Sequence, residues 1–128
     1  MKLHLARHSG RNAFTAYGPG YVAVNGVRYE RSIIVLPERI LLDWTATTFD
    51  ALTPDHFATL AGLAADIVLL GTGDAVRFPR PEIARPLIDA HIGLEVMDVQ
   101  AACRTYNILM DEQRKVAAAL VLESKGST

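Results

Sequence analysis

A short glycine-containing segment is the first feature of this sequence that could support chemistry. Gly71-Thr72-Gly73-Asp74 follows the apolar run 67–70, which is typical of a strand buried on both faces. Ligands of open α/β sheets bind beyond the carboxyl ends of strands, and glycines there leave backbone N–H groups accessible to an anion. A dinucleotide-binding loop also needs a third glycine and an immediate helix, and a P-loop needs a lysine; this segment has neither set. We favour a tight turn after the strand and keep an anion site as the alternative.

Arginine side chains near this segment could complete such a site. If the strands 67–70 and 93–97 are parallel neighbours, the glycine loop and the start of a helix over 98–110 emerge at one edge of the sheet. Guanidinium groups suit phosphate or carboxylate, although a solvated loop explains the same arginines and is the plainer interpretation. The candidate ligand-binding residues are Gly71, Thr72, Gly73, Arg77, Arg80 and Arg104.

The remaining reactive side chains do not assemble into a catalytic or metal site. Cys103 is the one cysteine, so no intrachain disulfide is possible, and a free cysteine is more often a core residue than a nucleophile. The four histidines lack a convincing metal-ligand spacing. We expect no cofactor, no metal and no catalytic residue. In a purely structural account of the segment 98–110, Tyr106 and Asn107 satisfy buried backbone groups.

The first half of the chain is predicted to form an antiparallel meander. Segments 21–24 and 27–29 flank Asn25-Gly26, the strongest short hairpin signal, because both turn positions need a positive φ. Segments 32–36 and 39–44 are expected to be further strands. Tyr17-Gly18-Pro19-Gly20 is interpreted as a tight turn that precedes the hairpin.

The second half changes to alternating helices and strands. Thr53-Pro54 is an N-cap followed by proline at the first helical position, which predicts a helix over 54–65. Helices are also expected over 81–91 and 98–110, and strands over 67–70, 93–97 and 115–122. This order predicts right-handed βαβ crossovers. We expect the crossover helices on one face of the sheet, and the meander and the helix 54–65 on the other.

These elements together predict an α/β fold. It is a single three-layer domain over 1–128, with a mixed central sheet that has βαβ crossovers and with an added antiparallel hairpin layer. The core is expected over about 10–122, with flexible ends at 1–9 and 123–128. Its buried strands include 67–70, 94–97 and 116–121.

Composition excludes several classes of protein. The chain has 128 residues, half of them apolar, and a net charge of −1, which is ordinary for a globular domain and excludes intrinsic disorder. The first 29 residues hold four basic groups and no acid, but the chain as a whole is slightly acidic, so we expect no nucleic-acid partner. The apolar stretch 57–73 is interrupted by Gly62 and Asp66, and the opening residues lack a secretory apolar core. We expect no membrane insertion and a cytoplasmic location.

Several motifs in fixed order resemble one known family. They are Tyr17-Gly18-Pro19-Gly20, the strand after Asn25-Gly26, Trp44, Leu70-Gly71-Thr72-Gly73, Pro79, Glu95-Val96-Met97-Asp98 and Ala101-Ala102-Cys103-Arg104-Thr105-Tyr106-Asn107. Over about 10–122, the chain is similar to a small family of domains of unknown function whose mitochondrial branch contains complex I assembly factor three. The resemblance implies a three-layer fold with a mixed sheet and no established catalytic activity. It also implies that mitochondrial members bind another assembly factor and early complex I subunits. Mitochondrial members carry an amino-terminal targeting segment; we expect none in this chain, which resembles the bacterial branch.

Two functions follow as hypotheses. The favoured one is a non-catalytic binding or assembly module that contacts a protein partner, with a link to respiratory complex I assembly. The alternative is a protein or enzyme that binds a small anionic molecule at the Gly71–Gly73 loop. A module should expose a contiguous apolar patch, whereas an enzyme should have a deep pocket with convergent polar groups. Trp44 is interpreted as the edge of the core, although a partner surface would also use a tryptophan.

Overall fold

The computed structural model describes residues 10–123, and the smaller of its two sheets is built near the start of that range. This antiparallel sheet has the order β1-β2-β3, with β1 at Phe14–Gly18, β2 at Tyr21–Val24 and β3 at Val27–Tyr29. Asn25 and Gly26 have φ values of 50° and 84°, which confirms the predicted hairpin turn between β2 and β3. The sequence pattern predicts no strand over 14–18. β1 forms there because it pairs with β2 across a bulge between Phe14 and Ala16.

The larger sheet has five strands in the order β5-β4-β8-β6-β7. Its members are β4 (Ile33–Leu36), β5 (Arg39–Leu41), β6 (Ile67–Thr72), β7 (Gly93–Met97) and β8 (Val116–Val121). β6 lies parallel to both β7 and β8, whereas β4 is antiparallel to β5 and β8. The predicted mixed sheet is therefore confirmed. The single meander is wrong, because β4 and β5 leave the hairpin and extend the central sheet beside β8.

Local backbone chemistry decides where the helices end. A short 3-10 helix, η1 (Phe49–Ala51), precedes α1 (Pro54–Ala61), and Thr53 N–H donates to Nδ1 of His56 at the start of α1 (3.0 Å). The prediction of a helix to residue 65 is wrong because Gly62 follows α1 and Ala64 has a left-handed φ of 61°. α2 (Pro81–Asp89) likewise stops before His91, whose φ is 57°. The predicted strand 39–44 stops at Leu41.

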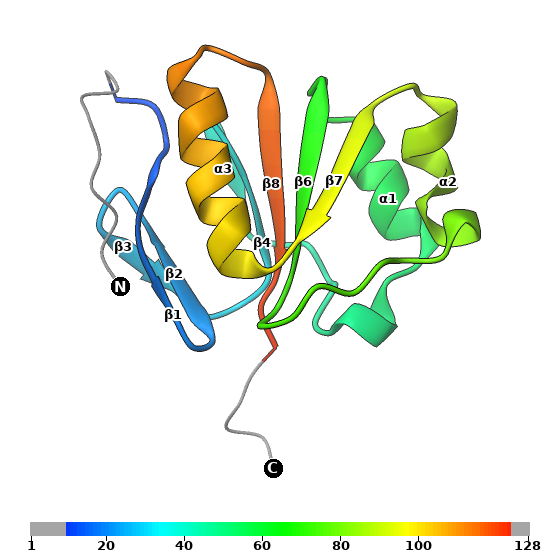
Figure 1. Ribbon diagram of the computed structural model, residues 1–128, viewed down its shortest axis with the longest axis horizontal. Coiled ribbons are helices and arrows are strands. Elements are labelled where there is room, and N and C mark those ends of the chain that lie inside the picture. The colour runs from blue at the N-terminus through cyan, green and yellow to red at the C-terminus, as the bar shows by residue number, and fades with distance from the viewer. Residues whose placement is uncertain (1–9, 124–128) are drawn as a thin grey trace.

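The helices and the small sheet form two layers around the central sheet (Figure 1). α1 and α2 pack together on one face, whereas α3 (Val99–Asp111) and β1–β3 lie on the other. The prediction that both crossover helices share a face is wrong. The chain moves outward from β6 to β7 and then back past β6 to β8. Because both crossovers are right-handed, opposite directions place α2 and α3 on opposite faces.

Two apolar cores therefore share the central sheet. One contains Phe14, Tyr106 and Leu120, and the rings of Phe14 and Tyr106 meet edge to face at 5.1 Å. The other contains Phe57 and Leu87, beneath α1 and α2. Within residues 10–123, no helix is long and apolar enough to cross a bilayer. The predicted flexible segment 1–9 and most of 123–128 lie outside the described residues.

Candidate functional site

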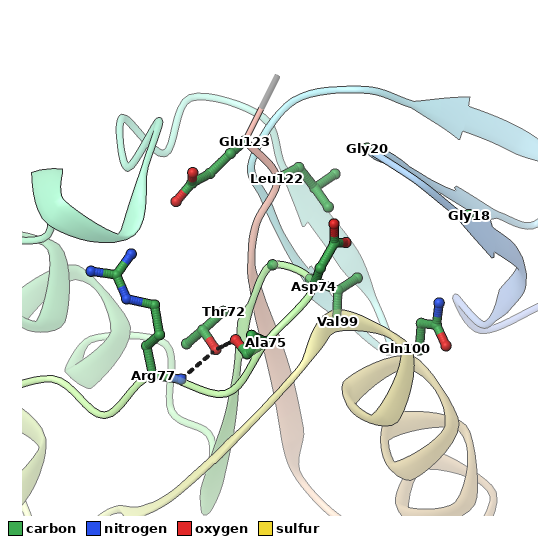
Figure 2. Close-up of a pocket in the computed structure, with 11 residues that line it drawn as sticks. Gly18, Gly20, Thr72, Asp74, Ala75, Arg77, Val99, Gln100, Leu122 and Glu123 are labelled. Atoms are coloured by element: carbon green, nitrogen blue, oxygen red, sulfur yellow. Dashed lines mark hydrogen bonds between the residues drawn. The ribbon is translucent and has the colours of Figure 1, made fainter. Parts of the chain in front are cut away.

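A pocket of about 310 Å³ lies at the carboxyl edge of the parallel strands. The loop after β6 leads to α2 on one face, and the loop after β7 leads to α3 on the other. Such a point, where neighbouring connections diverge, is where open α/β sheets hold their ligands. We call it the edge pocket (Figure 2). Its lining residues are Gly18, Gly20, Thr72, Gly73, Asp74, Ala75, Arg77, Val99, Gln100, Leu122 and Glu123.

Thr72 holds the loop that forms one wall of the edge pocket. Its hydroxyl donates to the carbonyl of Ala75 at 2.7 Å and accepts from the Arg77 N–H at 3.0 Å (Figure 2). Gly73 has a φ of 76°, and its carbonyl accepts from the Val99 N–H at 2.9 Å, which ties the loop to the start of α3. These bonds account for the glycine and threonine by loop geometry alone.

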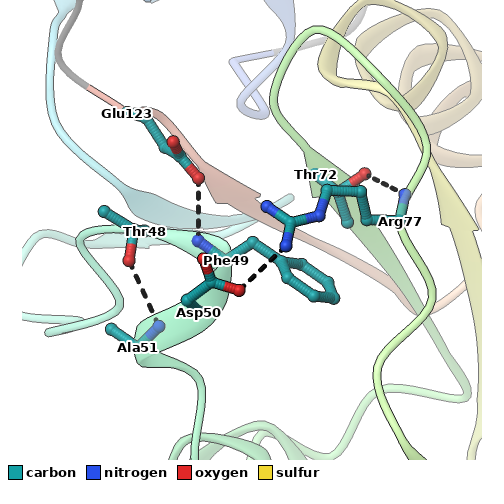
Figure 3. A network of polar contacts seen from close by, with 7 residues as sticks. All are labelled: Thr48, Phe49, Asp50, Ala51, Thr72, Arg77 and Glu123. Carbon is teal, nitrogen blue, oxygen red and sulfur yellow. Dashed lines mark hydrogen bonds and ion pairs between the residues drawn. The ribbon is translucent and has the colours of Figure 1, made fainter.

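The Arg77 guanidinium is already occupied by protein groups (Figure 3). Nη2 lies 2.8 Å from a carboxylate oxygen of Asp50, and the guanidinium carbon lies 4.2 Å from the centre of the Phe49 ring. Glu123 accepts from the Phe49 N–H at 2.9 Å. These contacts connect the loop after β6, η1 and the segment just after β8 on one side of the edge pocket. An incoming anion would have to compete with Asp50 for Arg77.

Carboxylates dominate the charge of the edge pocket. Asp74 and Glu123 line it against the single guanidinium of Arg77. The N-terminus of α3 is also nearby, but Asp98 caps it by accepting from the Ala101 N–H at 2.8 Å. A helix N-terminus attracts anions mainly when its own cap leaves the N–H groups available. The electrostatics therefore disfavour a simple anion here, and the anion site stays a prediction.

The structure brings together half of the predicted site residues. Thr72, Gly73 and Arg77 line the edge pocket. Gly71 does not: a Cβ there would lie 2.8 Å from Leu120 Cδ2 and 3.2 Å from the Val99 Cα. Its small size lets α3 approach the sheet closely, which is a packing role.

The other two predicted arginines lie outside the pocket lining. Arg104 donates from Nη1 to the Tyr17 hydroxyl at 3.0 Å, so it links α3 to β1. Arg80 occupies the N-cap position of α2. Arg104 would reach the loop only if the loop lay along the whole of α3, but the backbone bond between them is at Val99, the first residue of the helix.

Cys103 lacks the properties of a nucleophile. It is fully buried in the core between α3 and the central sheet, and desolvation raises the pKa of its thiol from 9.0 to about 12. Burial also raises the pKa of Tyr106 above its ordinary range. No group of three or more histidine, cysteine or acidic side chains in residues 10–123 is placed to hold a metal ion.

Tyr106 and Asn107 have the structural role that was open as an alternative. The Tyr106 hydroxyl donates to the carbonyl of Asn12 at 2.9 Å. Asn107 accepts from the Phe14 N–H and donates to the Phe14 carbonyl, both at 2.9 Å. Together they attach the edge strand β1 to α3, which fixes the small sheet against the central one.

An apolar groove beside β7 is the second candidate site, and none of the sequence motifs predicts it. We call it the β7 groove; its volume is about 500 Å³. Its lining residues are Phe78, Pro79, Pro81, Ala84, Ile88, Leu94, Glu95 and Val96. Phe78 is 73% exposed and Ile88 is 53% exposed, which is unusual for such large apolar side chains. The sequence feature that could have indicated this groove is Phe78, an aromatic residue among prolines and arginines. Trp44, the other candidate for a partner surface, is buried.

Comparisons with known proteins give a consistent picture. A model of the family described as "Protein of unknown function (DUF498/DUF598)" matches residues 14–121. The chain is 33% identical over 104 residues to a Bos taurus protein named NADH dehydrogenase (ubiquinone) 1 alpha subcomplex assembly factor 3, which covers 80% of this chain and 55% of that protein. This chain thus spans about half the length of that relative.

Two solved bacterial structures have the same fold. A Bordetella parapertussis protein is 41% identical, with a TM-score of 0.83 over 91% of this chain and 100% of the other. A Bordetella pertussis protein described as an Mth938-like domain is 35% identical, with a TM-score of 0.81 over 98% of this chain and 96% of the other.

Proposed function

Since this chain belongs to the DUF498/DUF598 family of proteins of unknown function, we propose that it is a non-catalytic, protein-binding module with a role in assembly. That membership confirms the resemblance found from the sequence motifs. The observation that carries the proposal is the β7 groove, where Phe78 and Ile88 are exposed beside an edge strand. The relatives named as assembly factors support the assembly role.

The chemistry of the β7 groove suits a protein partner. Seven of its eight lining residues are aliphatic, aromatic or proline, and Glu95 is the single charged one. Burying a large apolar side chain such as Phe78 contributes about 1.5–3 kcal/mol. An aromatic anchor surrounded by aliphatic contacts is the usual composition of a binding hot spot. Cys103, the one cysteine of the chain, does not favour a reaction, because burial raises the pKa of its thiol to about 12.

The partner in this proposal is a protein of respiratory complex I assembly, met in the cytoplasm. The support is the name of the similar Bos taurus protein, NADH dehydrogenase (ubiquinone) 1 alpha subcomplex assembly factor 3. This chain covers 55% of that protein. Its partner would therefore be one that the shared domain can hold by itself.

The test compares affinity capture by three forms of the tagged chain from its own host. The forms are the unchanged chain, Phe78→Asp in the β7 groove, and Val27→Asp as a matched control on β3. Val27 is 53% exposed and lies in the small sheet, away from the groove. We expect complex I proteins to be recovered with the unchanged chain and the control but not with Phe78→Asp, at equal thermal stability. Equal recovery with all three forms would contradict the proposal.

Small-molecule binding in the edge pocket is the second candidate function. The observation in its favour is the position of the pocket at the diverging connections after β6 and β7. Titration with a panel of nucleotides and carboxylates, followed by amide shifts, tests it. Saturable shifts confined to 72–77 and 98–101 would support this function, and shifts scattered elsewhere would exclude it.

A further inference from the structure

Among residues 10–123, no strand pairs with the outer side of β7, and the outward backbone groups of β7 can be assigned. The Gly93 N–H donates to the carbonyl of Asp66 at 3.1 Å, so the backbone of Gly93 faces β6. Backbone direction alternates along a strand. The N–H and C=O groups of Leu94 and Val96 therefore point away from β6, toward the open edge. Unpaired groups of this kind are a template for another strand.

The β7 groove lies where the side chains of an added strand would go. Leu94 and Val96 pack with the core beneath α1 and α2, so their side chains are on the face that α2 covers. Ala84 and Ile88, four residues apart on α2, line the same groove from above. Every second side chain of a strand added beside β7 would enter this groove. The groove is thus the exposed side of the core beneath α1 and α2, and it adjoins the edge strand β7.

The opposite edge of the central sheet is a poorer template. β5 has three residues and begins with the exposed, charged Arg39, whereas β7 has five. Short edge strands and charged side chains are common protections against strand addition. β7 has only Glu95 as a charged side chain, and Glu95 lies between the two outward-facing residues.

Glu95 decides which kind of strand fits. A second copy of this chain, paired with β7 over its full antiparallel length, would place Glu95 opposite Glu95, and like charges directly opposite are destabilising. A lysine or arginine at that position would instead pair with the exposed carboxylate. Charge complementarity therefore favours a different protein over a second copy.

We propose that β7 accepts an extended segment of the partner protein as a sixth strand, whose alternate apolar side chains fill the β7 groove and whose basic residue lies beside Glu95. This inference rests on the proposed function of the same groove and specifies the mode of binding. Backbone hydrogen bonds to Leu94 and Val96 supply the attachment, and the groove and Glu95 supply the selectivity.

The first test uses the synthetic peptide Thr-Val-Lys-Val-Lys-Val-Thr with blocked ends as the probe. At saturation, we expect amide exchange at Leu94 and Val96 to slow about tenfold or more, while Gly93, already bonded, changes little. A peptide with glutamate in place of lysine should bind about two- to fivefold more weakly. Glu95→Lys, a change at an exposed position, should reverse that preference. Unchanged exchange at Leu94 and Val96 would overturn the proposal.

Backbone methylation of the peptide separates strand addition from simple groove filling. An N-methyl group removes a donor, so methylating the valines blocks an antiparallel strand, and methylating the lysines blocks a parallel one. We expect one methylated peptide to fail and the other to bind. Equal binding of both would show that the backbone is not used, and would overturn the proposal.

Two further results distinguish the possible failures. Concentration-dependent self-association without peptide, with protection of Leu94 and Val96, would identify a second copy as the occupant and overturn the choice made here. If Phe78→Asp abolishes capture but the peptide leaves β7 unprotected, the protein-binding function holds and strand addition is wrong. If the peptide binds at β7 but capture is independent of Phe78, the proposed function fails by itself.

Discussion

Asn107 should carry a large share of the stability of this fold, because it holds two backbone groups in a dry interface. Its side chain accepts from the Phe14 N–H and donates to the Phe14 carbonyl, both at 2.9 Å. Phe14 is fully buried and Asn107 is 6% exposed, so water cannot replace these bonds. Asn107→Ala leaves both backbone groups unpaired, at about 1–3 kcal/mol each, partly offset by about 0.5 kcal/mol of helix propensity. We expect a loss of about 2–5 kcal/mol in the free energy of unfolding.

Urea unfolding followed by circular dichroism measures this loss, and amide exchange at Phe14 locates it. Ile108→Ala is the matched control, since the neighbouring Ile108 is 59% exposed and should change stability by less than about 0.5 kcal/mol. Asn107→Asp tests the donor separately, because an ionised carboxylate would face the Phe14 carbonyl. This variant should regain stability in acid, where the protonated carboxyl can donate. A loss below about 1 kcal/mol in Asn107→Ala, with Phe14 still protected, would refute the reasoning.

Three further changes test other parts of the structure. Burial raises the pKa of the Cys103 thiol from 9.0 to about 12, so this thiol ionises first in the unfolded chain. Its contribution to stability is constant below pH 9 and is lost as the pH rises toward 12. Cys103→Ala should reduce that slope by about 1.4 kcal/mol per pH unit in urea titrations. Gly71→Ala should cost about 1–3 kcal/mol through its contacts with the Leu120 side chain and the α3 backbone, whereas Gly62→Ala, with only ordinary contacts, should be neutral or stabilising in thermal melts. His56→Ala should cost about 0.5–2 kcal/mol by removing the acceptor for the Thr53 N–H, and His56→Gln should restore most of it; equal stability of the two variants would exclude the capping role.

The proposed partner interface at the β7 groove has a consequence for folding and solubility. An exposed edge strand beside an exposed phenylalanine is a predicted aggregation site when no partner is present. The charge of Glu95 and the three prolines at 79, 81 and 86 reduce, but do not remove, this tendency to aggregate. The proposed assembly role requires such a surface to stay available, so binding and stability would conflict at the β7 groove.

Local sequence determined most elements of this fold. Asn25-Gly26 specified the hairpin because few other pairs tolerate two positive φ values, and Thr53-Pro54 specified the start of α1. The buried runs in β6 and β8 were readable because strands covered on both faces need apolar residues at every position. Asp98 was readable as the cap of α3. Each of these signals acts within a few residues, which is why the sequence carries it.

Tertiary structure decided how those elements are arranged and which surfaces remain open. The reversal of direction after β7 placed α2 and α3 on opposite faces, and no local pattern encodes that strand order. Arg104 lies in the predicted helix, yet its distance from the edge pocket depends on which face of α3 meets β1. Phe78 and Ile88 are residue types that usually lie in a core. They are exposed here, where no strand lies beyond β7 among residues 10–123. Whether a side chain is buried depends on what packs against it, and that neighbour comes from a distant part of the chain or from another molecule.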